Sequence, residues 1–506
     1  MTAIVPLQVR DGSPLSIVRN LARQARLIFH RGGSTPGMAR PWRSFRSRYP
    51  GRGHSLRTLT AALGCAALVG GCALYHPLPL PRKPDLVGQL SALRTELPAM
   101  RSGQSPRRIA IDRPLEIDDV GWLAVLNDPQ LRSERGQMDL AQANLLQTSL
   151  LPNPSANLSW QALLAGTDFT SAWTASITED VKAIVTYHTR VKSAHYLMDQ
   201  VNADLLWREW QVAQNARLLA LDIYWGENAL RLGRREMRLF DAEVRDVKEA
   251  TAAGNLALTA LAPLLAAQSS AQQFLTALEL TQLRSWQQLD ALLGLEPQVR
   301  FPIARPALAP MPRHIGTFLA ELPERRPDLV ALRLGYRSAN ENVRTAIIGQ
   351  FPAFALGGAW GDDTANNRTV GPTATFDLPV FDRNQGQVAQ TRATRLLLHE
   401  QYQARLDRAV GTARGLAVEI ARLGGYVREA RSAATEAAGL SRSAQRAYAQ
   451  GNLDQRSLAD YETTALQRKI EAMALERALG EAHIAMTIEL GLGLPQTRIA
   501  PLANPR

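Results

Sequence analysis

Residues 250–256 read ATAAGNL, and residues 447–453 read AYAQGNL, 197 positions further along the chain. Glycine and asparagine tolerate the left-handed conformation in which many helices end, so each stretch predicts a helix followed by a turn. The shared Gly-Asn-Leu turn indicates that two parts of the chain are built alike.

Earlier matches extend this correspondence. Pro-Gln-Leu at 129–131 matches Pro-Asp-Leu at 327–329, Ala141 and Asn144 match Ala339 and Asn342, and Pro154 matches Pro352, all at an offset of 198. The matches follow one order at a nearly constant offset, which indicates duplication of one unit of about 200 residues. Such a unit is longer than solenoid repeats, which recur every ~20–50 residues.

Each unit contains the same predicted elements in the same order. A first helix starts at a proline, which is well tolerated at the first helical position, and spans about 129–150 or about 327–348. Two short strands follow, and then a proline-free helix over about 185–252 or 385–449. At ~1.5 Å per residue each long helix spans close to ~100 Å. After the Gly-Asn turn a shorter helix returns, over about 257–294 or 455–492.

The predicted strands alternate apolar and polar residues. In the second unit a strand from Phe354 leads into a polar turn at 362–367, and we predict a return strand at 373–381. Alternation over about ten residues is typical of transmembrane strands with a wet interior. A soluble sheet is the alternative for one hairpin, but two hairpins at equivalent positions favour membrane strands. Five aromatic residues then lie in or next to these strands: Trp160, Trp173, Phe354, Trp360 and Phe376.

The second long helix carries a regular heptad pattern. Apolar residues recur at alternating intervals of three and four, the period of coiled-coil packing, at Leu406, Ala409, Ala413, Leu416, Ile420, Leu423, Val427, Ala430, Ala434 and Ala437. The many alanines allow close approach between helices. The pattern therefore predicts long helices packed side by side.

The net charge of +12 is concentrated at the N-terminus. Eleven arginines and one acid precede Cys72, which leaves only +2 for the rest of the chain. A nucleic-acid-binding protein would carry its basic residues on a folded surface. Basic residues ahead of an apolar run are instead typical of a signal peptide, so we expect no nucleic-acid partner.

Residues 58–71 form an apolar run too short for a membrane-spanning helix, which needs about 20 residues. The run ends in Leu-Val-Gly-Gly-Cys at 68–72, which resembles a lipoprotein cleavage site with Cys72 as the lipidated residue. We predict a leader over 1–71, with Met1 or Met38 as the start, and a lipid-anchored extended segment over 72–120. Ala73 is the residue type associated with release to the outer membrane. An ordinary secretory signal, or cleavage at Cys65, is the alternative.

Four strands are too few to close a bacterial barrel, which needs at least eight. Open strand edges are not tolerated in lipid, so several copies of the chain must combine if the strands cross a membrane. The long helices could then lie side by side as a cylinder that continues the barrel.

The motifs of the second unit resemble those of the outer-membrane efflux proteins, the TolC-like channels. Residues 322–329 (LPERRPDL) resemble the opening of that family's second repeat, and residues 377–386 (DLPVFDRNQG) resemble a passage frequent in its heavy-metal-efflux branch. The resemblance covers about 120–495 and divides the chain into repeat 1 (121–300), repeat 2 (301–496) and a tail (497–506).

The resemblance implies a mainly α-helical fold with two membrane hairpins, assembled as a homotrimer with a twelve-stranded β-barrel continued by an α-helical barrel. It implies an outer-membrane duct that extends into the periplasm and exports small solutes or metal cations. The implied partners are a periplasmic adaptor, an inner-membrane pump of the resistance–nodulation–division type, and outer-membrane lipid. No catalytic activity is implied, and we expect no cofactor.

The resemblance also implies sites. The tip turns, where adaptors dock in the family, correspond to Gly254, Asn255, Leu256, Gly451, Asn452 and Leu453. Asp460 corresponds to a lumen-facing acid at the entrance, and Ser457 stands where a second acid would be. The simpler interpretations are helix stops for the tips and a solvated helix face for Asp460.

Other features favour structural roles. His188 and His195 are seven residues apart, whereas metal-binding pairs on a helix are usually four apart, so we predict no metal site. We expect the Arg325, Arg326 and Asp328 cluster to form ion pairs at a helix start and between protomers. The alternatives to a channel are a periplasmic coiled-coil adaptor or scaffold lipoprotein, and a periplasmic enzyme on a helical scaffold, for which clustered catalytic residues are missing.

Overall fold

The computed structural model describes residues 75–97, 107–162, 164–165, 171–307, 310–312 and 314–493. The predicted leader, Cys72 and the tail at 497–506 lie outside the described residues. The described residues from Leu86 onward belong to one compact unit, and residues 75–85 belong to another. In the latter, residues 75–85 contain no helix or strand.

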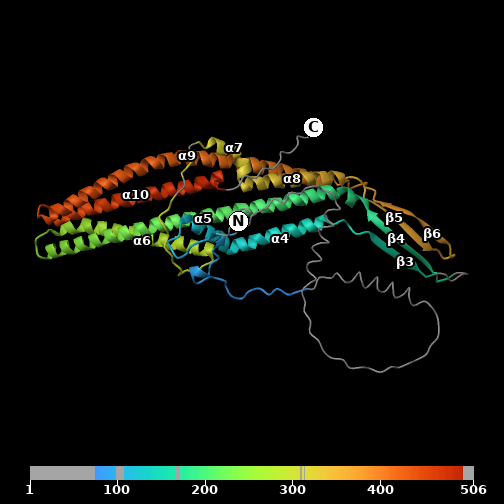
Figure 1. Cartoon of the computed structure of the whole chain (residues 1–506), viewed down its shortest axis with the longest axis horizontal. Helices are drawn as coiled ribbons and strands as arrows, with labels where there is room; N and C mark the ends of the chain where they lie inside the picture. The colour runs from blue at the N-terminus through green and yellow to red at the C-terminus, as the bar shows by residue number, and fades with distance from the viewer. Residues whose placement is uncertain are drawn as a thin grey trace, which may run out of the picture. The chain divides into compact units, whose positions relative to one another are not determined.

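The compact unit consists mainly of long helices and a four-stranded sheet, with a short β1–β2 pair before them (Figure 1). Its first part contains η1 (Leu90–Ala92), β1 (Glu96–Leu97), β2 (Arg107–Arg108), α3 (Ile117–Asn127), α4 (Pro129–Ser149), β3 (Ser155–Gln161), β4 (Ala172–Asp180), α5 (Val181–Ala252), η2 (Leu258–Ala260) and α6 (Leu261–Leu293). Its second part contains α7 (Gly316–Arg325), α8 (Pro327–Ile348), β5 (Phe354–Asp362), β6 (Arg368–Phe376), α9 (Gln385–Ala449) and α10 (Gln455–Leu490).

The predicted duplication is confirmed by this order. Helix α4, strands β3 and β4, and helices α5 and α6 correspond to α8, β5, β6, α9 and α10. The long helices have 72 and 65 residues, so each spans about 100 Å. Figure 1 shows both helix–turn–helix tips at one end of this unit and the sheet at the other.

The helices begin where polar side chains satisfy their first backbone N–H groups. The Asp128 carboxylate accepts hydrogen bonds from the Gln130 and Leu131 N–H groups at the start of α4. Asp180 and Asp454 cap α5 and α10 in the same manner. Such caps contribute roughly 0.5–2 kcal/mol each. Local sequence therefore places these three boundaries.

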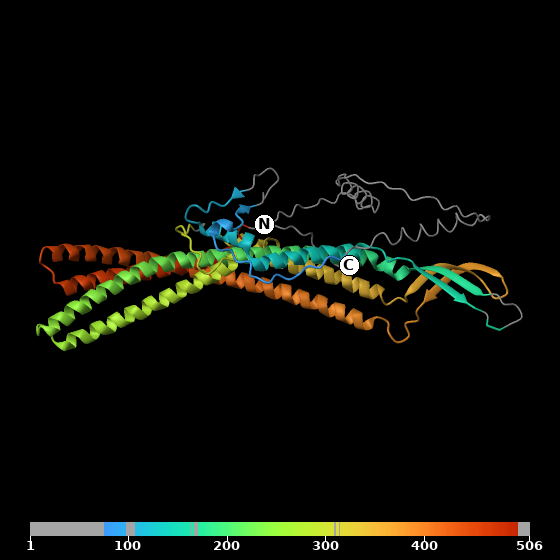
Figure 2. The ribbon, with the colours of Figure 1, turned by 90° about the horizontal axis from the view of Figure 1, so that it is seen from below.

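Side-by-side packing arranges the helices as a row. Near the sheet the neighbours follow the order α4, α5, α8 and α9, and toward the tips the order α6, α5, α10 and α9. Figure 2 shows the two helix pairs diverging toward their tips. Helix α9 therefore ends the row on one side, and α4 and α6 end it on the other.

The sheet has the antiparallel order β3-β4-β5-β6, so it joins the hairpins of both repeats. The predicted polar turn between β5 and β6 is confirmed, but the predicted return strand at 373–381 was wrong. The strand spans Arg368–Phe376, because Asp363 closes a tight turn by accepting hydrogen bonds from the Ala365 and Asn367 N–H groups. Pro379, which has no N–H, lies beyond the strand end.

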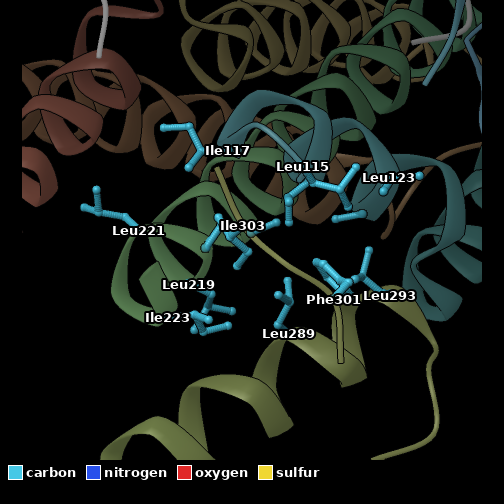
Figure 3. Close-up of a cluster of buried hydrophobic side chains, with 14 of the residues drawn as sticks. Leu115, Ile117, Leu123, Leu219, Leu221, Ile223, Leu289, Leu293, Phe301 and Ile303 are labelled. Atoms are coloured by element: carbon cyan, nitrogen blue, oxygen red, sulfur yellow. The ribbon is translucent and has the colours of Figure 1, made fainter. Parts of the chain in front are cut away.

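The main hydrophobic core gathers around α3 and the end of α6 (Figure 3). Side chains of α3 pack against α5, α6 and the segment after α6; fully buried members include Leu123, Ile223 and Leu289. Smaller clusters join α7 to α8, α9 and α10. Away from these clusters most of the long helices keep partly exposed faces.

Candidate functional surfaces

The strand register divides the sheet into two chemically distinct faces. Residues directly opposite each other on antiparallel strands have side chains on the same face. Trp160 pairs with Trp173, Trp360 with Ala175 and Val370, and Phe354 with Phe376. When these pairings are continued along the strands, nearly all the large apolar residues lie on one face. The charged residues on this face lie at its ends: Glu179 near the helices, and Asp362 and Arg368 near the β5–β6 turn. This face is called the apolar face below.

The opposite face is small and polar. It carries Ser155, Asn157, Ser159, Gln161, Ala172, Thr174, Ser176, Thr178, Asp180, Ala355, Gly357, Ala359, Gly361, Thr369, Gly371, Thr373 and Thr375. Hydroxyl, amide and glycine positions of this kind suit contact with water.

All five aromatic residues predicted for the membrane strands lie on the apolar face. The face is exposed rather than packed on a core: Trp160 retains 66% of its accessible surface, Phe376 58% and Val370 87%. Trp173 donates its indole N–H to Asp362 at 3.1 Å. A contiguous exposed apolar surface marks contact with another apolar phase or partner.

Two glycines on the polar face lie where strands β4 and β5 approach closely. A Cβ atom at Gly357 would lie 1.9 Å from the Ile177 carbonyl oxygen, and one at Gly361 2.2 Å from that of Trp173. Glycine in a strand permits such backbone approach and a tight bend. Sequence reasoning missed these two positions, although glycine inside an alternating strand was the available signal.

The passage from the sheet to α9 is held by the motif at 382–385. Asp382 accepts a hydrogen bond from the Asn384 N–H at 2.8 Å, and the Asn384 side chain donates to the Ala346 carbonyl at 2.8 Å. Asn384 has a φ of 61°, in the left-handed region that asparagine tolerates. Lys182 donates to the Gly349 carbonyl, which ties α5 to the end of α8. The sheet is thus fixed to the helices by polar contacts.

The two tip turns have the same backbone. Gly254 and Gly451 adopt φ values of 74° and 75°. The next N–H group, that of Asn255 or Asn452, donates to the carbonyl of Ala250 or Ala447. The expected positive φ at both glycines is confirmed. Tip residues Leu256 and Leu453 are exposed and half-buried respectively.

The tips differ in how the returning helix begins. At the second tip Asp454 accepts hydrogen bonds from both the N–H and the hydroxyl group of Ser457. At the first tip the equivalent positions are Ala257 and Ala260, and α6 has no side-chain cap. Ser457 therefore takes part in a helix cap. Its place at a channel entrance stays a prediction.

Asp460 is exposed on α10 and lies close enough to α5 to affect its acids. Burial, and next the negative charge of Asp460, raise the pKa of Glu243 on α5. Gln455 of α10 also donates a hydrogen bond to Asp246 of α5. Sequence reasoning missed both α5 acids, because contacts between helices about 200 positions apart leave no local signal.

Arg326 forms a buried ion-pair cluster within one chain. Its guanidinium binds both oxygens of Asp328, at 3.0 and 2.8 Å, and also pairs with Glu489 of α10. Arg405 of α9 adds a contact to Asp328 at 3.1 Å. Arg325 pairs with Glu321. The expected ion-pair network at the helix start is confirmed within one chain. Its contacts between protomers stay a prediction.

No three His, Cys, Asp or Glu side chains are grouped to hold a metal ion in the part of the chain that the structure describes. His188 is exposed, and His195 lies near Asp199 on the same helix. Within the described residues, none of the helices is both apolar enough and long enough to span a membrane.

No family model matches the chain, and no curated protein matches its sequence. Solved structures do share its fold. The CmeC outer membrane channel of Campylobacter jejuni superposes with a TM-score of 0.64 at 15% identity, covering 76% of this chain and 87% of that one. A membrane protein from Pseudomonas aeruginosa superposes with a TM-score of 0.63 at 16% identity, covering 84% of this chain and 98% of that one.

The open-state MtrE outer membrane channel of Neisseria gonorrhoeae gives a TM-score of 0.57 at 16% identity, covering 75% of this chain and 90% of that one. The chain therefore has the fold of these outer-membrane channels along nearly their whole length. The fold expected from the sequence motifs is confirmed at this level.

Proposed function

We propose that this chain is the outer-membrane channel of a tripartite efflux pump, a passive duct through which small solutes or metal cations are exported. One observation carries the proposal: a four-stranded sheet has an exposed apolar face and a polar face, and stands at the end of a row of ~100 Å helices. Proteins of this fold with known structures include outer membrane channels. We assign the chain no catalytic activity.

We propose that three copies combine to complete the channel. Strands β3 and β6 each have a neighbour on one side only within the described sheet. An unpaired strand edge in lipid leaves backbone N–H and C=O groups unsatisfied, each at a cost of several kcal/mol. Pairing β3 of one copy with β6 of the next closes the sheet by rotation, and three copies give twelve strands. A ring of this kind satisfies every edge.

The same rotation accounts for the helices. Helix α9 at one end of the row would pack against α4 and α6 of the next copy. The three rows would then form a helical tunnel that continues the barrel. In this assembly the apolar face of the sheet contacts lipid and the polar face lines the water-filled lumen.

The helix tips then lie at the far end of the tunnel, in the periplasm. We propose that the exposed turns at 254–256 and 451–453 dock a periplasmic adaptor. The adaptor would link the duct to an inner-membrane pump, of the resistance–nodulation–division type by motif resemblance. The pump would supply the energy for export.

We further propose that Cys72 is lipidated and anchors the chain in the outer membrane. Cys72→Ser should abolish incorporation of labelled palmitate. If the label is instead lost only in Cys65→Ser, then Cys65 is the lipidated residue and cleavage occurs before it.

Spin labels placed one at a time along β4, from position 172 to 180, test the channel. Labels at even-numbered positions, on the polar face, should be accessible to a water-soluble relaxation agent. Labels at odd-numbered positions, on the apolar face, should be accessible to a lipid-soluble one. On unboiled gels the protein should run as a heat-modifiable trimer, and it should fractionate with the outer membrane. Uniform accessibility to water together with monomeric migration would favour a scaffold or adaptor lipoprotein.

A further inference from the structure

A cationic pocket that no proposed channel feature uses lies between α8 and α9. It has a volume of about 290 Å³ and is lined by Arg333, Tyr336, Arg337, His399, Tyr402 and Gln403. Each helix contributes residues at i, i+3 and i+4, so each trio lies on one helix face. The lining contains two arginines and no carboxylate.

The charge of Arg337 is poorly compensated. Its guanidinium lies 5.9 Å from the Tyr196 ring and makes no ion pair with any of the described residues. Burial is the main cause that lowers the pKa of Arg337; nearby Arg333 lowers it further, while Tyr196 acts in the opposite direction. An arginine partly removed from water without a carboxylate partner favours binding of an anion.

Arg326 on the same stretch of chain provides the contrast. Its guanidinium is buried, yet Asp328 and Glu489 both neutralise it. Hydrogen bonds and charges from these two carboxylates raise the pKa of Arg326 despite its burial. Two carboxylates therefore neutralise Arg326. Among the described residues, none forms an ion pair with Arg337.

Aromatic rings form the walls of the pocket. The Tyr336 and His399 rings lie 6.3 Å apart at an angle of 56°. The Tyr402 ring is half-buried next to α7 and α8. Arg333 donates to the Pro323 carbonyl at 3.1 Å, which holds its side chain at the pocket edge. Planar rings and a guanidinium together suit a ligand that is both flat and anionic.

We propose that the α8–α9 pocket binds a small organic anion, a carboxylate or phosphate ester carried on a planar ring. The anionic group would bind Arg337, with Arg333 beside it, and the ring would lie against Tyr336 and Tyr402. The volume lies just below the usual range for small-molecule sites, so a ligand of one or two fused rings fits. This inference does not depend on the proposed export duct, since it uses contacts within one chain.

Fluorescence anisotropy of 2-naphthoate, titrated with the full purified chain in detergent, tests the pocket. We expect saturable binding that Arg337→Gln weakens about tenfold or more, the usual effect of losing a hydrogen bond to a charged group. Arg337→Lys should retain part of the affinity. Arg344→Gln is the matched control, because Arg344 lies on the same helix, is exposed and pairs with Glu341.

Two further ligands identify the headgroup. 2-Naphthyl phosphate should compete with 2-naphthoate for the pocket. The compound that binds more tightly shows whether the pocket prefers a phosphate or a carboxylate group. Uncharged 2-naphthol should compete at least tenfold more weakly; equal competition would overturn the anion assignment.

Unchanged 2-naphthoate binding in Arg337→Gln would also overturn the proposal. A second copy of the chain is the other source of a counter-charge. In that case the wild-type protein would bind no 2-naphthoate, and Arg337→Gln would instead lower the thermal stability of the oligomer. That outcome would assign Arg337 to a subunit interface.

Discussion

At the scale of single residues, the tip glycines show how backbone conformation selects an amino acid. A Cβ atom at Gly254 or Gly451 would meet no other atom within 4 Å, so space does not require glycine there. The φ values of 74° and 75° require glycine, because a β-carbon in the left-handed region approaches the following carbonyl oxygen.

This difference predicts opposite effects for two glycine substitutions in the second hairpin. Gly451→Ala should destabilise the tip by about 1–2 kcal/mol. Gly439→Ala, inside α9 where a Cβ also meets nothing, should stabilise the helix by up to about 1 kcal/mol. Hydrogen exchange of the segment 440–460 would measure both. Equal protection in the two variants would show that the turn does not limit local stability.

Asp222 provides a titrating contact between the repeats. Arg477 of α10 donates to Asp222 of α5 at 2.9 Å and to Glu481 at 2.7 Å, so two carboxylates share one guanidinium. Burial raises the pKa of Asp222 to about 7, with Glu481 adding to the increase and Arg477 opposing it.

The raised pKa predicts the direction of a pH effect. Between pH ~4 and ~7 the folded state retains a proton that the unfolded state has lost, so stability falls as pH rises through this window. The melting temperature of wild type minus that of Asp222→Asn should therefore decrease over this window, by a few degrees. Differential scanning calorimetry in detergent measures this. A constant difference across the window would mean that Asp222 is ionised throughout.

At the scale of elements, the sheet depends on close approach of two strands from different repeats. Gly357→Val should separate β4 from β5, because a Cβ at this position would lie 1.9 Å from a backbone oxygen that cannot move independently. Gly371→Val, on the same face of β6, should be tolerated, because a Cβ there meets nothing within 4 Å.

Outer-membrane fractionation and heat-modifiable migration compare these two valine variants. Loss of the assembled form only in Gly357→Val would agree with the register. Loss in both variants would indicate that β6 is more closely packed in the assembly than in one chain.

At the scale of the whole molecule, the proposed trimer would place three copies of Asp460 around one entrance. Glu243 of α5 lies near each copy, so the negative charge there comes from two helices. Rings of acidic side chains attract cations into a pore. Ser457, engaged in a helix cap, adds no charge.

Asp460→Asn should therefore weaken block by multivalent cations in planar-bilayer recordings, while assembly and single-channel opening persist. The effect should be modest, because Glu243 remains. Glu429→Gln, an exposed acid on α9, is the control and should leave block unchanged. Unaltered block in Asp460→Asn would place Asp460 outside the conducting path.

Local chemistry determined much of this architecture. Prolines at 129 and 327 start helices, glycines at 254 and 451 end them, and heptad spacing predicts the packed face of α9; each depends on only a few neighbouring residues. Strand alternation likewise predicted the strands that carry five aromatic residues, and the register then shows that all five share one face. The start of β6 was misplaced because the Asp363 carboxylate accepts a hydrogen bond from the Asn367 N–H, which shortens the turn.

Only the tertiary structure decided which distant residues meet. Four features join residues from separate helices. They are the row order of the helices, the α5–α10 contacts of Asp222 and Asp246, the ion pairs of Arg326 within one chain, and the pocket at Arg337. Two heptad helices can pair in several registers of similar local energy. The register is selected by the sum of all side-chain contacts along ~100 Å of helix, which no short stretch of sequence contains.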